Sequence, residues 1–275
     1  MDTNVIMSFI LTLFVGLTMG LGSLFSFLIK DGNKKFLSLA LCFSAGIMIY
    51  ISFMEILPEG IHLIEEAYPG TKGHVIVLAS FFGGMLMTAL LEKGVHAMGG
   101  HHHPELDKDG LEKEVSKEEE DRNHLEKLGI MTAASIAIHN LPEGLAIFTA
   151  GLRDITIAIP LAIAVILHNI PLSIAISVPI YFSTKSKKKA FLYSSIVGLF
   201  QPLGAIIGYM LFSSFFNDTL FGILFGVISG IMIFVSFDEL IPTSRQYKDH
   251  HYSVYGTILG MFVMAVSLMF FGHSH

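Results

Sequence analysis

Two short polar runs stand inside apolar segments of the chain and share the pattern His-Asn-x-Pro. The first begins at His139 and continues to Glu143, and the second begins at His168 and has Leu172 where the first has its glutamate. Imidazole, amide and carboxylate groups are costly in hydrocarbon unless something compensates them. A divalent cation provides that compensation, so the two runs predict a metal site inside a membrane.

The first run has the spacing of a helix-borne ligand pair. His139 and Glu143 are four positions apart, which places both side chains on one face of a helix. Imidazole nitrogen and carboxylate oxygen suit Zn²⁺ and other first-row divalent ions. Pro142 and Pro171 have no backbone N–H, so each opens its helix beside the polar side chains. The alternative is a buried histidine that only hydrogen-bonds to a neighbour. That alternative accounts well for one such run and poorly for two on adjacent helices.

The composition predicts that membrane helices carry these residues. Of 275 residues, 52% are hydrophobic and only 15% are charged, against about a quarter charged in soluble domains. The apolar segments lack the ten-residue alternation of a barrel, so we expect an all-α integral membrane protein with eight transmembrane helices. The predicted spans are 4–28, 36–57, 74–92, 129–151, 154–182, 190–212, 218–242 and 253–272. The single cysteine, Cys42, excludes a disulfide framework and a Cys₄ zinc site.

Basic residues predict the orientation of this bundle in a cell (inner) membrane. Fifteen of the 17 lysines and arginines follow the odd-numbered spans, and only Lys72 and Arg153 follow the even-numbered ones. By the positive-inside rule the fifteen are cytoplasmic and both termini lie outside. The chain then divides into 1–96 with helices one to three, a flexible cytoplasmic loop over 97–128, and 129–275 with helices four to eight. The loop carries His101, His102 and His103, which either bind metal weakly or are simply solvated.

An internal repeat links the second and seventh spans. Residues 45–58 and 229–242 are identical at eight of fourteen positions. The two spans cross in opposite directions, and inverted repeats are common in transporters. No P-loop is present, so ATP-driven pumping is not predicted, and no motif predicts a nucleic-acid partner.

Carboxylates in the repeat are candidates for guiding an ion. Glu55 and Glu239 occupy matching repeat positions, so we expect them to collect and release cations at opposite mouths of the pathway. Met54 offers a soft thioether beside Glu55, although such a methionine is more often packing. For Glu59 and Asp238, solvation of a helix end explains the residue equally well.

Five segments together resemble one known family. They are MEILPEG at 54–60, HNLPEG at 139–144, HNIP at 168–171, VPIYFSTKSKKK at 178–189 and DELIP at 238–242. In this combination the chain resembles the ZIP family of divalent-metal transporters, especially its bacterial zinc-uptake members. The resemblance implies inverted three-helix repeats, helices 1–3 and 6–8, around a central pair of helices four and five. It implies Zn²⁺ as the transported ion, with Fe²⁺, Mn²⁺, Co²⁺ or Cd²⁺ as alternatives, and a membrane protein that is not an enzyme.

The resemblance also implies a ligand set, from which this chain departs. A first metal position would use His139, Glu143 and His168. A second would use Asn140 and Asn169, share Glu143, and draw carboxylates from helices five and six. This chain has Leu172 and Gln201 at those last two places. Because two carboxylates are absent, we expect one central ion instead of two.

Two other functional classes remain open at this stage. An intramembrane zinc metallohydrolase would also use helix-borne His and Glu, but Asn140 stands where the H-E-x-x-H pattern has its base. A metal-binding homologue without transport would rely on the His-bearing loop. Monomer and homodimer are both compatible with the sequence.

Overall fold

The computed structural model describes residues 3–27, 34–98, 117–213, 215–247 and 250–271, and regular secondary structure in these ranges is entirely helical. In chain order the helices are α1 (Thr3–Ser26), α2 (Lys34–Ile51), the π-helix η1 (Ser52–Ile56), α3 (Leu57–Ala67), α4 (Thr71–Met98), α5 (Lys117–Arg153), α6 (Ile155–Thr184), α7 (Lys187–Gly198), α8 (Phe200–Phe212), α9 (Asp218–Val235), the π-helix η2 (Ser236–Leu240), α10 (Ile241–Tyr247) and α11 (His250–Phe271).

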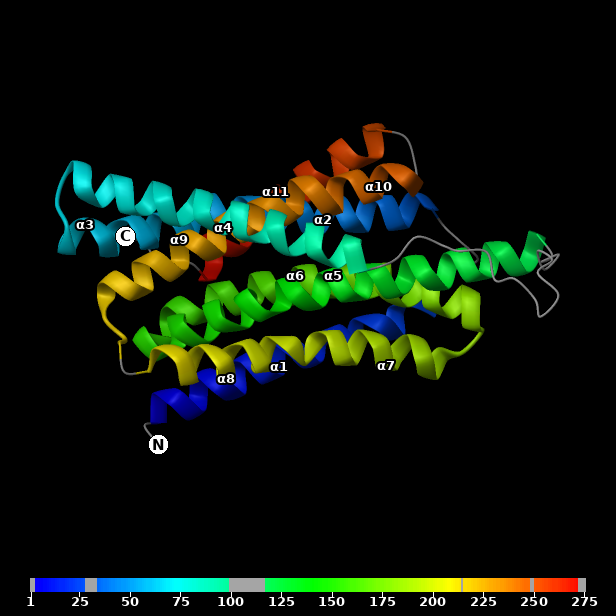
Figure 1. The fold of residues 1–275 in the computed structure, drawn as a ribbon, viewed down its shortest axis with the longest axis horizontal. Coiled ribbons are helices and arrows are strands. Elements are labelled where there is room, and N and C mark those ends of the chain that lie inside the picture. Colours follow the sequence, from blue (N-terminus) through cyan, green and yellow to red (C-terminus); the bar gives the residue numbers. More distant parts are fainter. Residues whose placement is uncertain (1–2, 28–33, 99–116, 214, 248–249, 272–275) are drawn as a thin grey trace.

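The eight predicted spans all have helical counterparts. They correspond to α1, α2–η1–α3, α4, α5, α6, α7–α8, α9–η2–α10 and α11. Within the described residues, seven of these are long and apolar enough to cross a membrane. The eighth, α5, carries His139, Asn140 and Glu143, which lower its hydropathy. Both chain ends lie at the same end of the bundle (Figure 1), as an even number of crossings requires. The predicted all-α membrane fold is confirmed.

Two helix boundaries differ from the sequence-based expectation. The second span was expected to end at residue 57, but the helix continues through Pro58 to Ala67. Pro58 directly follows the π-helix η1, and this local change in the bonding pattern accommodates a residue without an N–H inside a continuous helix. The structure also begins α5 at Lys117, inside the predicted loop 97–128, because the segment is rich in Glu, Lys and Leu. His101, His102 and His103 lie outside the described residues.

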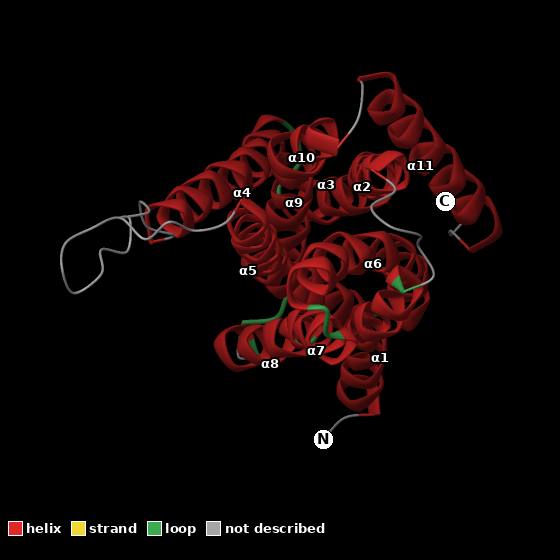
Figure 2. Cartoon of the chain, turned by 90° about the vertical axis from the view of Figure 1, so that its right-hand side faces the viewer, coloured by secondary structure: helices red, strands yellow, loops and turns green. Residues whose placement is uncertain are grey.

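The helices form two groups that meet along the middle of the bundle. The first group contains α1, α5, α6, α7 and α8, and the second contains α2–α3, α4, α9, α10 and α11. Figure 1 shows the second group above the first, and Figure 2 shows the same division end-on. Each helix packs mainly within its own group, and the principal contacts between groups are α2 with α6 and α5 with α9. Each group can therefore move as a unit without losing its own packing.

The internal repeat of the sequence is also a structural repeat. The π-helices η1 and η2 occupy matching positions, and each begins with a serine, Ser52 or Ser236. Ser52 Oγ donates to the carbonyl of Met48 at 2.6 Å, and Ser236 Oγ donates to that of Met232 at 2.7 Å. A π-turn inserts one extra residue and changes the face on which the next side chains lie; such turns are frequent at functional sites. Here they orient the repeat carboxylates Glu55 and Glu239.

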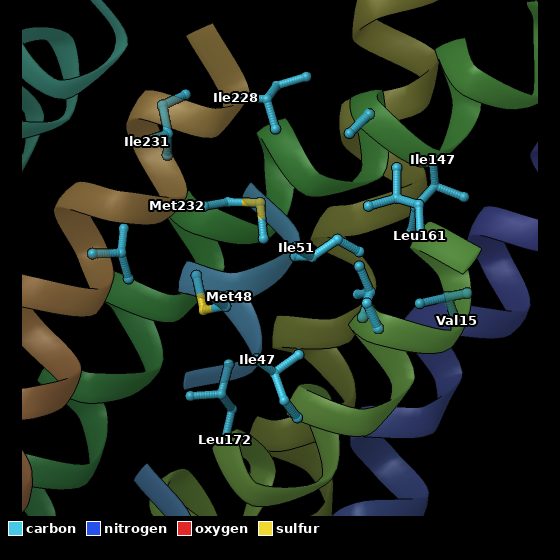
Figure 3. Packing of buried hydrophobic residues seen from close by; sticks show 14 of the residues in the cluster. Val15, Ile47, Met48, Ile51, Ile147, Leu161, Leu172, Ile228, Ile231 and Met232 are labelled. Atoms are coloured by element: carbon cyan, nitrogen blue, oxygen red, sulfur yellow. The ribbon is translucent and has the colours of Figure 1, made fainter. Parts of the chain in front are cut away.

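An apolar cluster fills the boundary between the two groups. Figure 3 shows ten of its residues by label: Val15, Ile47, Met48, Ile51, Ile147, Leu161, Leu172, Ile228, Ile231 and Met232. Leu172 of α6 lies beside Ile47 of α2 in this view and is 4% exposed. The leucine that replaces the expected carboxylate therefore belongs to the apolar packing between the groups.

Candidate metal centre

His139 of α5 lies between two carboxylates from the second group of helices. Its Nε2 is 3.4 Å from Glu92 Oε1 of α4, and its Nδ1 is 3.4 Å from Glu239 Oε2 of η2. The ligand atoms of Glu92, His139 and Glu239 all lie within 4.8 Å of one another. Within the described ranges this is the one group of three or more His, Cys, Asp or Glu residues that are so close. Tetrahedral Zn²⁺ with bonds of about 2.0–2.1 Å separates its ligand atoms by roughly 3.3 Å. The two 3.4 Å contacts involve opposite ring nitrogens of His139, and a single ion binds only one of them, so an ion here would draw the ligand atoms closer together.

A serine holds one of these carboxylates in place. Ser135 Oγ donates to Glu239 Oε2 at 2.7 Å. Ser135 lies one turn before His139 on α5, so the bond draws Glu239 toward the histidine. Hydrogen bonds of this kind orient metal ligands and tune their affinity.

A second pair of ligands lies deeper within the first group. His168 Nε2 of α6 is 3.2 Å from Glu143 Oε1 of α5, and both side chains are buried. The other oxygen, Glu143 Oε2, accepts a hydrogen bond from Gln201 Nε2 of α8 at 3.2 Å. Three of the four ring nitrogens of His139 and His168 are 3.2–3.4 Å from carboxylate oxygens, and among the described residues His168 Nδ1 has no hydrogen-bond partner. Buried polar atoms without such partners are rare in folded proteins, and bound ions are one explanation.

The buried amides are engaged by other groups. Gln201 Nε2 also lies 3.4 Å from Asn169 Oδ1, and Asn169 Nδ2 donates to the carbonyl of Val15 at 3.3 Å. Asn140 Nδ2 donates to the carbonyl of Val197 at 2.8 Å and to Met19 Sδ at 3.1 Å. The amides of Gln201 and Asn169 also pair the other way, because Asn169 Nδ2 donates to Gln201 Oε1 at 3.4 Å. At Glu143, Gln201 therefore presents an N–H where a metal ligand would present a lone pair.

Backbone contact between α5 and α8 places Gln201 beside Glu143. A Cβ on Gly144 would lie 1.8 Å from the Gln201 carbonyl oxygen, and one on Gly204 would lie 2.0 Å from that of Leu141. The two helices can cross this closely only because glycine has no side chain. The crossing fixes the position of the amide relative to the carboxylate.

We expect Gly144→Ala to destabilise this crossing. The added methyl meets backbone atoms that cannot rotate away, and overpacking of this kind typically costs about 1–3 kcal/mol. For a chain of this size that corresponds to a fall in Tm of roughly 3–10 °C, measured by thermal unfolding in detergent. Gly83→Ala on α4 is the matched control, since a Cβ there meets nothing within 4 Å. Equal Tm values for both variants would contradict the tight crossing.

The structure divides the predicted ligands between two clusters. Glu143 lies with His168, whereas His139 lies with Glu92 and Glu239. Glu239, expected at a mouth of the pathway, is thus beside a central histidine. Sequence reasoning missed Glu92; its signal was a carboxylate in the apolar run LLEKG, within the helix instead of beyond its end.

The remaining predicted residues lie apart from both clusters. Met54 is 55% exposed on the outer surface of the bundle, so its thioether does not face the histidines. Glu55 is partly buried and belongs to neither cluster in the described ranges. Glu59 pairs with Arg153, at 3.7 Å from Nε to Oε1.

The charge of the centre favours a cation. Glu92, Glu143 and Glu239 carry three negative charges when ionised, and the two histidines are the nearest compensating groups. Buried carboxylates are strongly unfavourable unless they are paired or coordinate a metal. The arrangement can therefore hold a dication with nitrogen and oxygen ligands.

Comparison with known proteins agrees with this chemistry. The family model for ZIP zinc transporters matches residues 3–128 and 100–268. The zinc transporter ZupT of Streptococcus mutans is 45% identical over 271 residues, covering 98% of this chain and 100% of that protein. ZupT of Clostridium perfringens is 46% identical over 277 residues, covering 98% and 97%. ZupT of Lysinibacillus sphaericus is 45% identical over 269 residues, covering 98% and 99%.

Proposed function

The chain belongs to the ZIP zinc transporter family, and on this premise we propose that it carries Zn²⁺ across the membrane into the cytoplasm. The observation that carries the proposal is the cluster of Glu92, His139 and Glu239. Its histidine comes from the first group of helices and its carboxylates come from the second. Movement of one group against the other therefore makes or breaks the ligand set, as a transporter requires and a storage site does not.

The two clusters provide successive positions for one ion. In the outer-to-inner direction, the ion is first held by Glu143 and His168 with His139 turned toward them, and His139 then carries it to Glu92 and Glu239. His139 and Glu143 are one helical turn apart, so rotation of the imidazole is sufficient for the transfer. Because both positions need His139, only one of them is filled at a time.

The placement of basic residues along the helices supports an orientation of the protein in the membrane. Glu92 and Lys93 lie in the C-terminal part of α4, which runs toward the end of the bundle where α6 is followed by α7 (Figure 1), and the lysines of 185–189 belong to that junction. We propose that the protein lies in the inner membrane with that end in the cytoplasm. Both termini are then outside. The His139 cluster is then nearer the cytoplasm than the Glu143 pair, so an ion that enters from outside would meet the Glu143 pair first. Fe²⁺, Mn²⁺, Co²⁺ and Cd²⁺ are competitors for the same nitrogen and oxygen ligands.

The centre holds a single ion at a time. Gln201 Nε2 donates to Glu143 Oε2, so the amide engages the carboxylate oxygen that a second cation would need. Leu172 supplies no ligand, because it packs beside Ile47. Anomalous scattering from zinc-soaked crystals measures this directly, and two fully occupied ions between α5 and α6 would contradict it.

Uptake of radioactive zinc into proteoliposomes tests the function. We expect protein-dependent accumulation that saturates with zinc and is competed by other dications. Empty liposomes are the control. Absence of flux together with peptide or lipid hydrolysis would favour the intramembrane hydrolase instead. Zinc binding without either activity would favour a homologue that does not transport.

Glu92 offers a direct test of the inner position. Glu92→Gln keeps the size of the side chain but removes the charge that holds the ion beside His139. Loss of outer-shell partners alone reduces metal affinity or activity by about 10–100-fold, and we expect at least that reduction in the rate of zinc uptake. Glu66→Gln makes the same change at an exposed position on α3 and is the matched control. If Glu92→Gln takes up zinc at the wild-type rate, Glu92 does not hold the ion during transport.

A further inference from the structure

Arg153, the last residue of α5, connects the two groups of helices at the end of the bundle away from the basic loops. Its Nε is 3.7 Å from Glu59 Oε1 of α3, and its Nη1 donates to Asp218 Oδ1 at the start of α9. The Glu59 side chain is 11% exposed and that of Arg153 is 25% exposed. Charged side chains are seldom buried to this degree unless they are paired. The contact is therefore a structural feature of this conformation.

Both acceptors of Arg153 belong to one tightly packed unit. A Cβ on Gly60 of α3 would lie 3.1 Å from the carbonyl oxygen of Gly222 on α9. The helices that carry Glu59 and Asp218 are thus nearly in backbone contact and move together. Arg153 comes from the other group, so its ion pairs break whenever the groups separate at this end.

Helix α5 is consequently attached to the second group at two places. His139 and Arg153 are fourteen positions apart, which is about 21 Å along a helix and within about 40° of the same face. Toward the cytoplasmic end, His139 contacts Glu92 and Glu239, and at the other end Arg153 contacts Glu59 and Asp218. We propose that Arg153 is a positioning residue that keeps the outer side of the protein closed while His139 engages the inner carboxylates.

Opening the outer side would make the surface that an arriving ion meets more negative. When Arg153 withdraws, Glu59 and Asp218 lose their positive partner at the outer surface. Carboxylates lining an opening raise the local concentration of cations. The same movement thus opens the path and prepares it to collect a dication. This last step depends on the proposed transport function, whereas the closure itself does not.

Cysteine accessibility measures the closure without any transport assay. Ala146 lies midway between His139 and Arg153 on nearly the same face of α5 and is 1% exposed. In a Cys42→Ala background, Ala146→Cys should react slowly with a membrane-impermeant thiol reagent added from outside. Adding Arg153→Gln should speed labelling roughly threefold to tenfold, the population shift expected from losing a partly buried ion pair. Arg153→Lys keeps the charge, so its labelling rate should be close to the slow rate measured with Arg153 in place.

Controls separate closure from general effects on charge or folding. Lys72→Gln removes the other basic residue expected on the outer side, which is exposed on α4, and should leave labelling unchanged. Glu59→Gln removes the buried partner and should speed labelling as Arg153→Gln does. Unchanged labelling in both Arg153→Gln and Glu59→Gln, or equal acceleration by Lys72→Gln, would overturn the proposal. If Arg153→Gln does not fold, Glu59→Gln alone decides the result. Zinc uptake is measured separately, so failure of transport does not affect this test.

Discussion

Replacing His139 with alanine should reduce zinc uptake into proteoliposomes by at least about 100-fold, because a direct ligand matters more than the outer-shell partners whose loss already costs 10–100-fold. His139 contacts Glu92 and Glu239 and lies one turn from Glu143, so it is the one residue that both ion positions share. Removing it eliminates both positions, whereas removing any other ligand weakens only one. The measurement is the initial rate of zinc accumulation at saturating and at low zinc.

His62→Ala is the matched control for this substitution. The His62 side chain is 61% exposed on α3 and forms an ion pair with the similarly exposed Glu66. Its uptake should match that of the wild type. Substantial flux through His139→Ala would show that the ion passes between Glu143 and Glu239 without this imidazole, and the proposed transfer would be wrong.

Replacing Gln201 with glutamate should create a second ion position. The new carboxylate would face Glu143 Oε2, which the Gln201 amide now approaches at 3.2 Å. Two carboxylates this close repel each other unless a cation lies between them. We therefore expect bound zinc to rise from one ion to two per protein. Without zinc the variant should be less stable than the wild type, and saturating zinc should raise its Tm by roughly 5 °C more than it raises that of the wild type.

Two further substitutions test whether the second ion depends on a carboxylate at position 201. Gln201→Met keeps a similar volume without the amide or the charge, so it should bind one ion and show no additional stabilisation by zinc. Leu172→Glu should not add an ion by itself, because Leu172 packs beside Ile47 in the apolar boundary between the groups. A single ion in Gln201→Glu would mean that the amide does not occupy a cation position.

The local sequence determined much of the metal chemistry and nearly all of the topology. Hydropathy predicted the membrane helices, and the charge of the loops predicted their orientation. The repeat of 45–58 and 229–242 lies on two spans that these predictions place in opposite directions. The spacing of His139 and Glu143 depends on one helix alone. Pro58 shows the limit of such local rules, because a proline that follows a π-helix inside a continuous helix resembles one that ends a helix.

Only the tertiary structure decided which ligands meet. Glu92 is 47 positions from His139 and Glu239 is a further 100 positions on, so no local pattern joins them. The packing of α4, α5 and η2 brings them together, and the Gly144 crossing decides that Gln201 donates to Glu143. Leu172 lies within apolar packing for the same reason. The sequence alone shows which residues can bind a metal ion. Which of them bind together depends on how the helices pack, and this chain divides its ligands between two groups of helices that can move.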